Sequence, residues 1–242
     1  VDAGTADVFS NLDDVLEEDF RHPIPMGIPG IDNLLKGGIA KGELGVVLAP
    51  TGVGKSTLLT KIANHAFNLG YNVLQIFFED NPKIIQRKHF TLWTGIAPDL
   101  LSMHKDKVLA KVKDIQENSP NKLILKKLPS DTLTMNQIKN QIRKMMAEGT
   151  KIDMVVLDYI DCVVPDKNLG DEWKSEGSVM RSFEAMNHEL NLVGWTATQG
   201  NRNSISSEVV TTDQMGGSIK KAQVGHVIIS VAKSLQQKEM NL

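Results

Sequence analysis

The stretch APTGVGKS, residues 49–56, has the residue types of a loop that binds phosphate groups. An apolar run precedes it and a helical pattern follows it, which is the context that this motif requires. Gly52 and Gly54 let the backbone turn its amides toward one point, and the following helix adds the positive end of its dipole. Lys55 would place its charge near the β- and γ-phosphates, and the Ser56 hydroxyl would ligate Mg²⁺. The expected phosphate-binding residues are Ala49, Pro50, Thr51, Gly52, Val53, Gly54, Lys55, Ser56 and Thr57.

A loop of this kind works with a carboxylate that holds the metal ion, usually an aspartate that ends an apolar strand. Asp158 follows the run MVVL and fits this role. Asp161 lies three residues further on, where we expect a solvated or capping acid rather than a metal ligand. Asp153 precedes the strand and is expected to mark its polar boundary. Ser56 and Asp158 are therefore the predicted metal ligands.

Nucleotide hydrolysis also needs a group that activates or orients water. Glu79 ends the apolar run 73–78, which we expect to lie beside the strand before the phosphate loop. Its carboxylate could then reach over the nucleotide, and we predict that Glu79 is the catalytic base. Asp80 competes for this role, and the alternative for both acids is that they cap the helix that begins at Asn81 and Pro82.

Gln199 follows another apolar run, 192–198, and lies in the string TQGNR. A neutral amide at this place can touch the γ-phosphate while the adjoining loop contacts something else, which is how a switch behaves. The alternative is a polar strand end without a role. With Glu79 and Lys55, Gln199 is a predicted catalytic residue.

These residues stand at the ends of strands in a repeated pattern of strands and helices. Strands that are apolar on both faces and separated by helices indicate an α/β fold with a mostly parallel sheet covered on both sides. Two polar, irregular segments, 165–174 and 200–213, each follow a strand, and ligands of such sheets bind at that edge. The apolar runs predict strands at 45–49, 73–78, 123–128, 154–158, 192–198 and 227–232. The helical patterns lie at 55–69, 82–94, 100–118, 135–148 and 176–191.

The N-terminal segment has a different character. Residues 7–20 have apolar side chains near helical spacing and acidic side chains opposite them, which predicts a short amphipathic helix. Residues 22–30 are rich in proline and glycine and are predicted to form a joint. The helix could cover its own domain or a neighbouring subunit, because periodicity does not say whose surface it meets.

The composition excludes several classes of protein. The 242 residues are 41% hydrophobic and 23% charged, which excludes a chain that is disordered throughout. The single cysteine, Cys162, excludes an internal disulfide framework, and we expect it to be a small buried side chain in a cytosolic protein. No apolar run approaches the length of about 18 residues that crosses a membrane, and no signal-peptide pattern is present. With a net charge of −2, a nucleic acid would have to be held by local patches or backbone donors.

Together the motifs resemble the RecA-fold motor domain of DnaB-type replicative helicases, in particular the phage-like branch. The resemblance rests on APTGVGKS, the glutamate in IFFED, VVLDYID, TQGNR and DQMGGSIKKA, and it runs from residue 25 to residue 242. The Asp-Tyr pair in VVLDYID and the Gln-x-Asn-Arg string are its most specific parts. The resemblance implies a RecA-like P-loop ATPase that uses ATP and Mg²⁺, moves along single-stranded DNA as a hexameric ring and unwinds the duplex ahead.

The resemblance also implies roles for single residues. Residues 49–57 would bind ATP, Ser56 and Asp158 would bind Mg²⁺, Glu79 would activate water and Gln199 would sense the phosphate. DNA would meet the loop after Gln199 and the segment 215–218, the latter largely through backbone amides. The implied DNA contacts are Arg202, Asn203, Met215, Gly216, Gly217, Ser218, Lys220 and Lys221. A solvated helix end is the alternative for the lysine pair.

The implied domain organisation has an acidic linker helix and joint at 1–24 and the ATPase motor domain at 25–242. The family's Lys-x-Arg string, whose arginine reaches the neighbouring subunit's nucleotide, does not occur before Leu242, and we expect it beyond that residue. Hydrolysis by this chain alone is then expected to be weak, because such an arginine contributes roughly 10³–10⁵ in rate. Primase and a helicase loader would bind through regions outside the chain. The implied location is the bacterial cytosol, with no membrane partner, and the phage-like branch allows a phage-encoded protein.

Two other functions would use the same residues. A KaiC-like or recombinase-like ATPase would use its nucleotide state for assembly or signalling, and the segment PMGIPGIDNLLKGGIAKGE also suits that group. Hydrolysis that responds to single-stranded DNA distinguishes the motor from this switch. A nucleotide-binding module without catalysis would lose no turnover when Glu79 is replaced by glutamine.

Overall fold

A computed structural model describes residues 7–16, 21–166, 172–199 and 223–232 of the chain. The described residues form a six-stranded sheet in the order β3-β2-β4-β5-β1-β6, and every neighbouring pair of strands is parallel. The α/β class and the parallel sheet expected from the apolar runs are confirmed. The strands are β1 (Leu44–Ala49), β2 (Val73–Phe77), β3 (Leu123–Lys127), β4 (Met154–Asp158), β5 (Val193–Gln199) and β6 (Val227–Ser230).

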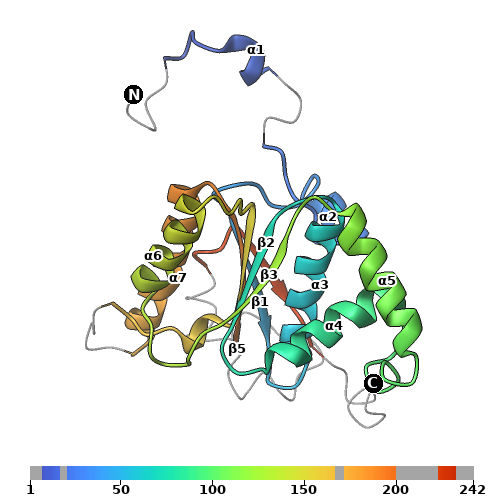
Figure 1. Cartoon of the computed structure of the whole chain (residues 1–242). Coiled ribbons are helices and arrows are strands. Elements are labelled where there is room, and N and C mark those ends of the chain that lie inside the picture. The colour runs from blue at the N-terminus through green and yellow to red at the C-terminus, as the bar shows by residue number, and fades with distance from the viewer. Residues whose placement is uncertain (1–6, 17–20, 167–171, 200–222, 233–242) are drawn as a thin grey trace.

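Helices cover both faces of this sheet. On one face lie α6 and α7, and on the other lie α3, α4 and α5 (Figure 1). A single-turn 3₁₀ helix, Ile160–Cys162, follows β4. The helices in the described ranges are α1 (Leu12–Val15), α2 (Pro29–Leu34), α3 (Lys55–Asn68), α4 (Pro82–Thr94), α5 (Lys105–Asn118), α6 (Met135–Ala147) and α7 (Glu172–Leu190).

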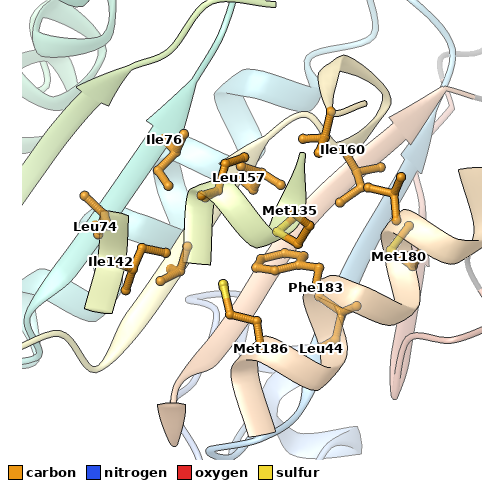
Figure 2. Packing of buried hydrophobic residues seen from close by; sticks show 14 of the residues in the cluster. Leu44, Leu74, Ile76, Met135, Ile142, Leu157, Ile160, Met180, Phe183 and Met186 are labelled. Atoms are coloured by element: carbon orange, nitrogen blue, oxygen red, sulfur yellow. The ribbon is translucent and has the colours of Figure 1, made fainter. Parts of the chain in front are cut away.

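Successive side chains of β1 and β4 enter two different hydrophobic cores. Val46 and Val155 belong to the first core, which packs against α6 and α7 through side chains such as Phe183 (Figure 2). Val47 and Val156 belong to the second core, which packs against α3. Both faces of the central strands are therefore dry, which is why their sequences are continuous apolar runs without alternation.

The position of β2 differs from the expectation. We expected the strand that carries Glu79 to lie beside the strand before the phosphate loop, but β4 and β5 stand between β2 and β1. The helical crossover after β1 is long enough to pass over other strands, and all of the central strands are equally apolar. The neighbour of β2 on this side is β4, which ends at Asp158.

Most of the predicted elements are confirmed, and the differences lie mainly at their ends. The helix predicted at 100–118 begins at Lys105, and the strand predicted at 227–232 ends at Ser230. Residues 172–174, expected to be irregular, belong to α7. Of the helix expected at 7–20, the structure describes the single turn α1, and residues 17–20 lie outside the described ranges.

The proline- and glycine-rich segment that we interpreted as a joint is partly built into the domain. Ile24 pairs with Ile39 in an antiparallel bridge, and both side chains are buried in the second core. Pro29 begins α2, where its missing N–H costs nothing. Within this helix, the Asp32 carboxylate accepts hydrogen bonds from the backbone N–H groups of the three residues 26–28, which precede the helix, at 2.7, 3.0 and 2.9 Å. The segment ahead of β1 is thus fixed by packing into the second core and by hydrogen bonds to one carboxylate.

Cys162 is buried, with 3% of its surface exposed, as the sequence predicts. Across the described ranges, no helix combines the length and the apolar character needed to cross a membrane.

Candidate nucleotide-binding site

The loop between β1 and α3 has the backbone geometry of a phosphate cradle. Gly52 and Gly54 have φ angles of 79° and 100°, which disfavour any residue with a side chain. Gly54 is the N-cap of α3, and no side chain occupies the cap. The first amides of the helix are therefore free to face an anion, and the helix dipole adds to their effect.

The two predicted metal ligands lie together at this loop. The Ser56 hydroxyl donates a hydrogen bond to Asp158 Oδ1 at 3.1 Å. Asp158 has 5% of its surface exposed, and burial raises the pKa of its carboxyl, while the Ser56 hydrogen bond acts in the opposite direction. Among the described residues, no group of three or more His, Cys, Asp or Glu side chains could hold a metal ion by itself. Two hard oxygens beside a phosphate cradle fit Mg²⁺, which commonly takes one or two protein ligands together with substrate phosphates.

Lys55 is held at the same place. Its ammonium nitrogen lies 3.4 Å from the carbonyl oxygen of Ala49 and 5.5 Å from the centre of the Tyr159 ring. Burial lowers the pKa of Lys55, and the charges of the nearby carboxylates of Asp161, Asp158 and Glu79 act in the opposite direction. The lysine is thus a partly buried cation that points toward the phosphate loop.

Glu79 follows β2 with an exposed side chain, and the Tyr159 hydroxyl donates a hydrogen bond to its Oε1 at 3.3 Å. Asp80 forms an ion pair with Lys88 at 2.9 Å. The N-cap of α4 is Asn81, whose side chain accepts a hydrogen bond from the backbone N–H of the residue two positions later. The capping role that we considered for the two acids therefore belongs to Asn81.

Gln199 ends β5 and faces the phosphate loop. Its Oε1 accepts a hydrogen bond from the Thr51 hydroxyl at 3.4 Å, and its Nε2 donates to the Tyr159 hydroxyl at 3.1 Å. Its backbone N–H donates to Asp161 Oδ2 at 3.0 Å, and the Thr198 hydroxyl donates to the same carboxylate at 2.9 and 3.1 Å. Asp161 therefore fixes the end of β5, which places the Gln199 side chain.

The structure brings the predicted residues of the loop, Ser56, Asp158, Glu79 and Gln199 to one edge of the sheet. Sequence reasoning missed the two residues that connect them. Tyr159 was noted only as part of an Asp-Tyr pair, and Asp161 was expected to be a solvated or capping acid. The signal for both was present, since Tyr159 follows β4 directly and Asp161 lies two residues further on, at the edge where ligands of such sheets bind.

The predicted DNA contacts lie outside the described residues. They are Arg202, Asn203, Met215, Gly216, Gly217, Ser218, Lys220 and Lys221. Their roles stay predictions.

The chain is similar in sequence or in structure to several known proteins. The family model of the DnaB-like helicase C terminal domain matches residues 23–209. The DNA repair protein RadA of Aquifex aeolicus (strain VF5) is 31% identical over 100 residues, which cover 41% of this chain and 22% of that protein. The chain thus spans well under two thirds of the curated relative that it matches.

Two solved structures superpose on the chain with a TM-score of 0.72 and 16% sequence identity. One is described as an ATPase domain, for which 87% of this chain and 76% of that chain are covered. The other is a DnaB-like replicative helicase, described with its interactions with primase, for which 86% and 51% are covered. At this identity the two structures show a shared RecA-like fold. The match of the family model to more than half of the sequence shows that the chain belongs to the DnaB-like helicase C-terminal domain family.

Proposed function

We propose that this domain is the ATP-hydrolysing motor of a replicative DNA helicase, which moves along single-stranded DNA as a hexameric ring and unwinds the duplex ahead. The observation that carries the proposal is the meeting, at one edge of the sheet, of an open phosphate loop, the Ser56–Asp158 pair and the Glu79–Tyr159–Gln199 cluster. Family membership supports the helicase assignment.

Each residue has a distinct part in this proposal. Backbone N–H groups within residues 49–57, other than Pro50, which has none, and the Lys55 ammonium bind the phosphates of ATP. Ser56 and Asp158 would hold Mg²⁺, which would supply positive charge to neutralise the phosphates. The Glu79 carboxylate takes the proton of the attacking water as the oxygen of that water bonds to the γ-phosphorus and the bond to the β-phosphate oxygen breaks. Gln199 contacts the γ-phosphate and reports its presence to the residues that follow.

The partners are also part of the proposal. Single-stranded DNA would meet Arg202, Asn203, Lys220 and Lys221 and the backbone of residues 215–218. ATP would be hydrolysed at subunit interfaces of the ring, with an arginine from a neighbouring subunit. Primase and a helicase loader would bind outside the chain, the acidic segment 1–24 would act as linker and joint ahead of the motor domain 25–242, and the protein would work in the bacterial cytosol.

Hydrolysis of ATP by the full-length protein, with and without single-stranded DNA, tests the proposal. We expect strong stimulation by the strand, and loss of hydrolysis in Lys55→Ala and Glu79→Gln. Lys61→Ala on the exposed side of α3 and Glu117→Gln on the exposed side of α5 are matched controls that should retain activity. Unchanged turnover in Glu79→Gln would contradict the proposal and indicate a nucleotide-binding module.

The sequence similarity to the DNA repair protein RadA supports a second candidate function. In this alternative the protein is a recombinase-like or KaiC-like ATPase whose nucleotide state controls assembly. Hydrolysis that depends on Glu79 but is indifferent to single-stranded DNA, without unwinding of a forked duplex, would favour this switch over the motor.

A further inference from the structure

A single chain of hydrogen bonds crosses the candidate site from the phosphate loop to Glu79. The Thr51 hydroxyl donates to Gln199 Oε1 at 3.4 Å, Gln199 Nε2 donates to the Tyr159 hydroxyl at 3.1 Å, and that hydroxyl donates to Glu79 Oε1 at 3.3 Å. The four residues come from the loop after β1, the end of β5, the residue after β4 and the second residue after β2. This run of hydrogen bonds therefore connects every strand end that carries a predicted catalytic residue.

The direction of donation in this chain is fixed by chemistry. The amide nitrogen of Gln199 can only donate, and the Glu79 carboxylate can only accept. The Tyr159 hydroxyl has one proton and stands between them, so it accepts from Gln199 and donates to Glu79. A tyrosine hydroxyl keeps its proton at neutral pH, so it is available as the donor to Glu79. The Cys162 thiol also lies within hydrogen-bonding range, but a thiol is a weaker acceptor than a carboxylate.

Tyr159 is also firmly placed. Its ring packs against both hydrophobic cores of the sheet, and the Lys55 ammonium lies 5.5 Å from the ring centre. The residue before it, Asp158, is tied to Ser56 of the phosphate loop. The backbone carbonyl of Tyr159 accepts the N–H of Cys162 in the following 3₁₀ turn.

The strand order explains why a bridging residue is needed. Gln199 extends from β5 and Glu79 from β2, and these strands do not touch, because β4 lies between them. A side chain that follows β4 is the nearest group that can contact both. Tyr159 occupies that position, and its hydroxyl reaches both partners.

We propose that Tyr159 is a positioning residue, which holds the Glu79 carboxylate and the Gln199 amide in one hydrogen-bonded arrangement, so that a change at Gln199 alters the placement of the catalytic carboxylate. The inference rests on the proposed hydrolytic function of the site. Movement of Gln199 by a phosphate or by a bound strand would pass through the tyrosine hydroxyl to Glu79.

The Tyr159→Phe variant removes the hydroxyl and keeps the ring beside Lys55 and the two cores. We expect kcat for basal ATP hydrolysis to fall about tenfold or more, the effect of a lost hydrogen bond to a charged group, while the KM for ATP stays within about twofold. Stimulation by single-stranded DNA should fall as well. Tyr71→Phe is the control, since this other tyrosine precedes β2, at the end opposite Glu79.

A double-mutant cycle separates a relay from a merely local effect. Basal hydrolysis is measured for Tyr159→Phe, for Gln199→Ala and for the double variant, with the melting temperature and binding of a fluorescent ATP analogue as checks on folding. If Tyr159 acts between Gln199 and Glu79, the double variant should lose little more than the more impaired single variant. Effects on kcat that multiply, or a Tyr159→Phe variant with wild-type kcat, would overturn the inference.

The results for these variants distinguish failure of the positioning role from failure of the proposed function. If Glu79→Gln abolishes hydrolysis while Tyr159→Phe matches the wild type, the positioning role fails and the motor stands. If Glu79→Gln leaves hydrolysis unchanged, both fail. If the wild type does not respond to single-stranded DNA, the motor fails, and the cycle on basal hydrolysis still decides the role of Tyr159.

Discussion

His89 Nδ1 lies 3.1 Å from the side-chain nitrogen of Asn64, and both residues are buried between α3 and α4. On its other side, His89 Nε2 lies 2.9 Å from Gln75 Oε1 in β2. Asn64 Oδ1 accepts a hydrogen bond from Asn68, so the Asn64 nitrogen faces the ring as a donor and Nδ1 must be unprotonated. The ring is therefore the neutral Nε2–H tautomer, which ties the helix after the phosphate loop to the strand before Glu79.

Acid should unfold the protein partly through His89. Burial lowers the pKa of this ring from 6.5 to about 4, so between these values the unfolded chain binds a proton that the folded chain does not. The contribution of the neutral ring is fully present above pH 6.5 and is lost as pH falls toward 4; the shift corresponds to about 3 kcal/mol. Urea unfolding at several pH values measures it. His89→Phe should flatten the slope between pH 6.5 and 4, and exposed His104→Gln should not; equal slopes in all three proteins would refute this assignment.

Replacing Asp158 by asparagine should weaken the use of Mg²⁺. The amide keeps the size of the side chain and can still meet the Ser56 hydroxyl, but it removes the negative charge that would face the cation. We expect the Mg²⁺ concentration for half-maximal hydrolysis to rise about tenfold or more, within the range seen when groups around a metal are altered. A Mg²⁺ titration of ATP hydrolysis checks this. The exposed Asp114→Asn on α5 serves as the control, and an unchanged Mg²⁺ requirement in Asp158→Asn would remove Asp158 from the metal site.

Gly54→Ala should weaken phosphate binding through the backbone. Nothing lies within 4 Å of a Cβ at this position, so the cost comes from the φ angle of 100° alone. An L-residue there loses roughly 1–2 kcal/mol, or the loop changes shape. We expect weaker binding of a fluorescent ATP analogue with little change in the second core. Gly30→Ala on α2 is the matched control, because its surroundings are equally open and its φ is not positive. Equal affinity for the analogue in both variants would contradict the cradle geometry.

Phe183→Ala should destabilise the face of the sheet covered by α6 and α7. Phe183 is fully buried in the first core (Figure 2), so truncation removes apolar contacts and leaves a cavity. We expect the free energy of unfolding to fall by about 3–5 kcal/mol. Urea unfolding measures the loss. Leu34→Ala, whose side chain is 83% exposed, should change stability little. A similar fall in the free energy of unfolding for both variants would mean that the burial of Phe183 does not explain its contribution to stability.

The sequence was sufficient for the elements and for the glycine turn that joins β1 to α3, because each depends on local patterns. The apolar runs and the turn glycines predicted β1 and α3 nearly to the residue. The order of the strands did not follow from these patterns, since a helical crossover can pass over one neighbour or several. Placing β2 beside β1 was therefore wrong.

The residues that connect the site by hydrogen bonds were harder to predict from the sequence than the strand order. Tyr159 matters because it contacts groups from two other strands, and no local pattern records such a meeting. The same holds for Gln75 and His89, which are polar and yet almost fully buried. Their hydrogen bonds explain their burial, but only the fold brings the partners together.

The strand order has one more consequence. With strands about 4.8 Å apart, three spacings place β2 about 14 Å from the strand that leads into the phosphate loop. In the proposed function, the phosphate-binding loop after β1 and the catalytic Glu79 after β2 therefore extend from strands three spacings apart, and side chains at the ends of β4 and β5 bridge them. If Glu79 has the proposed role, the Glu79→Gln variant should bind ATP and leave it unhydrolysed, so that the ATP-bound state could be imaged.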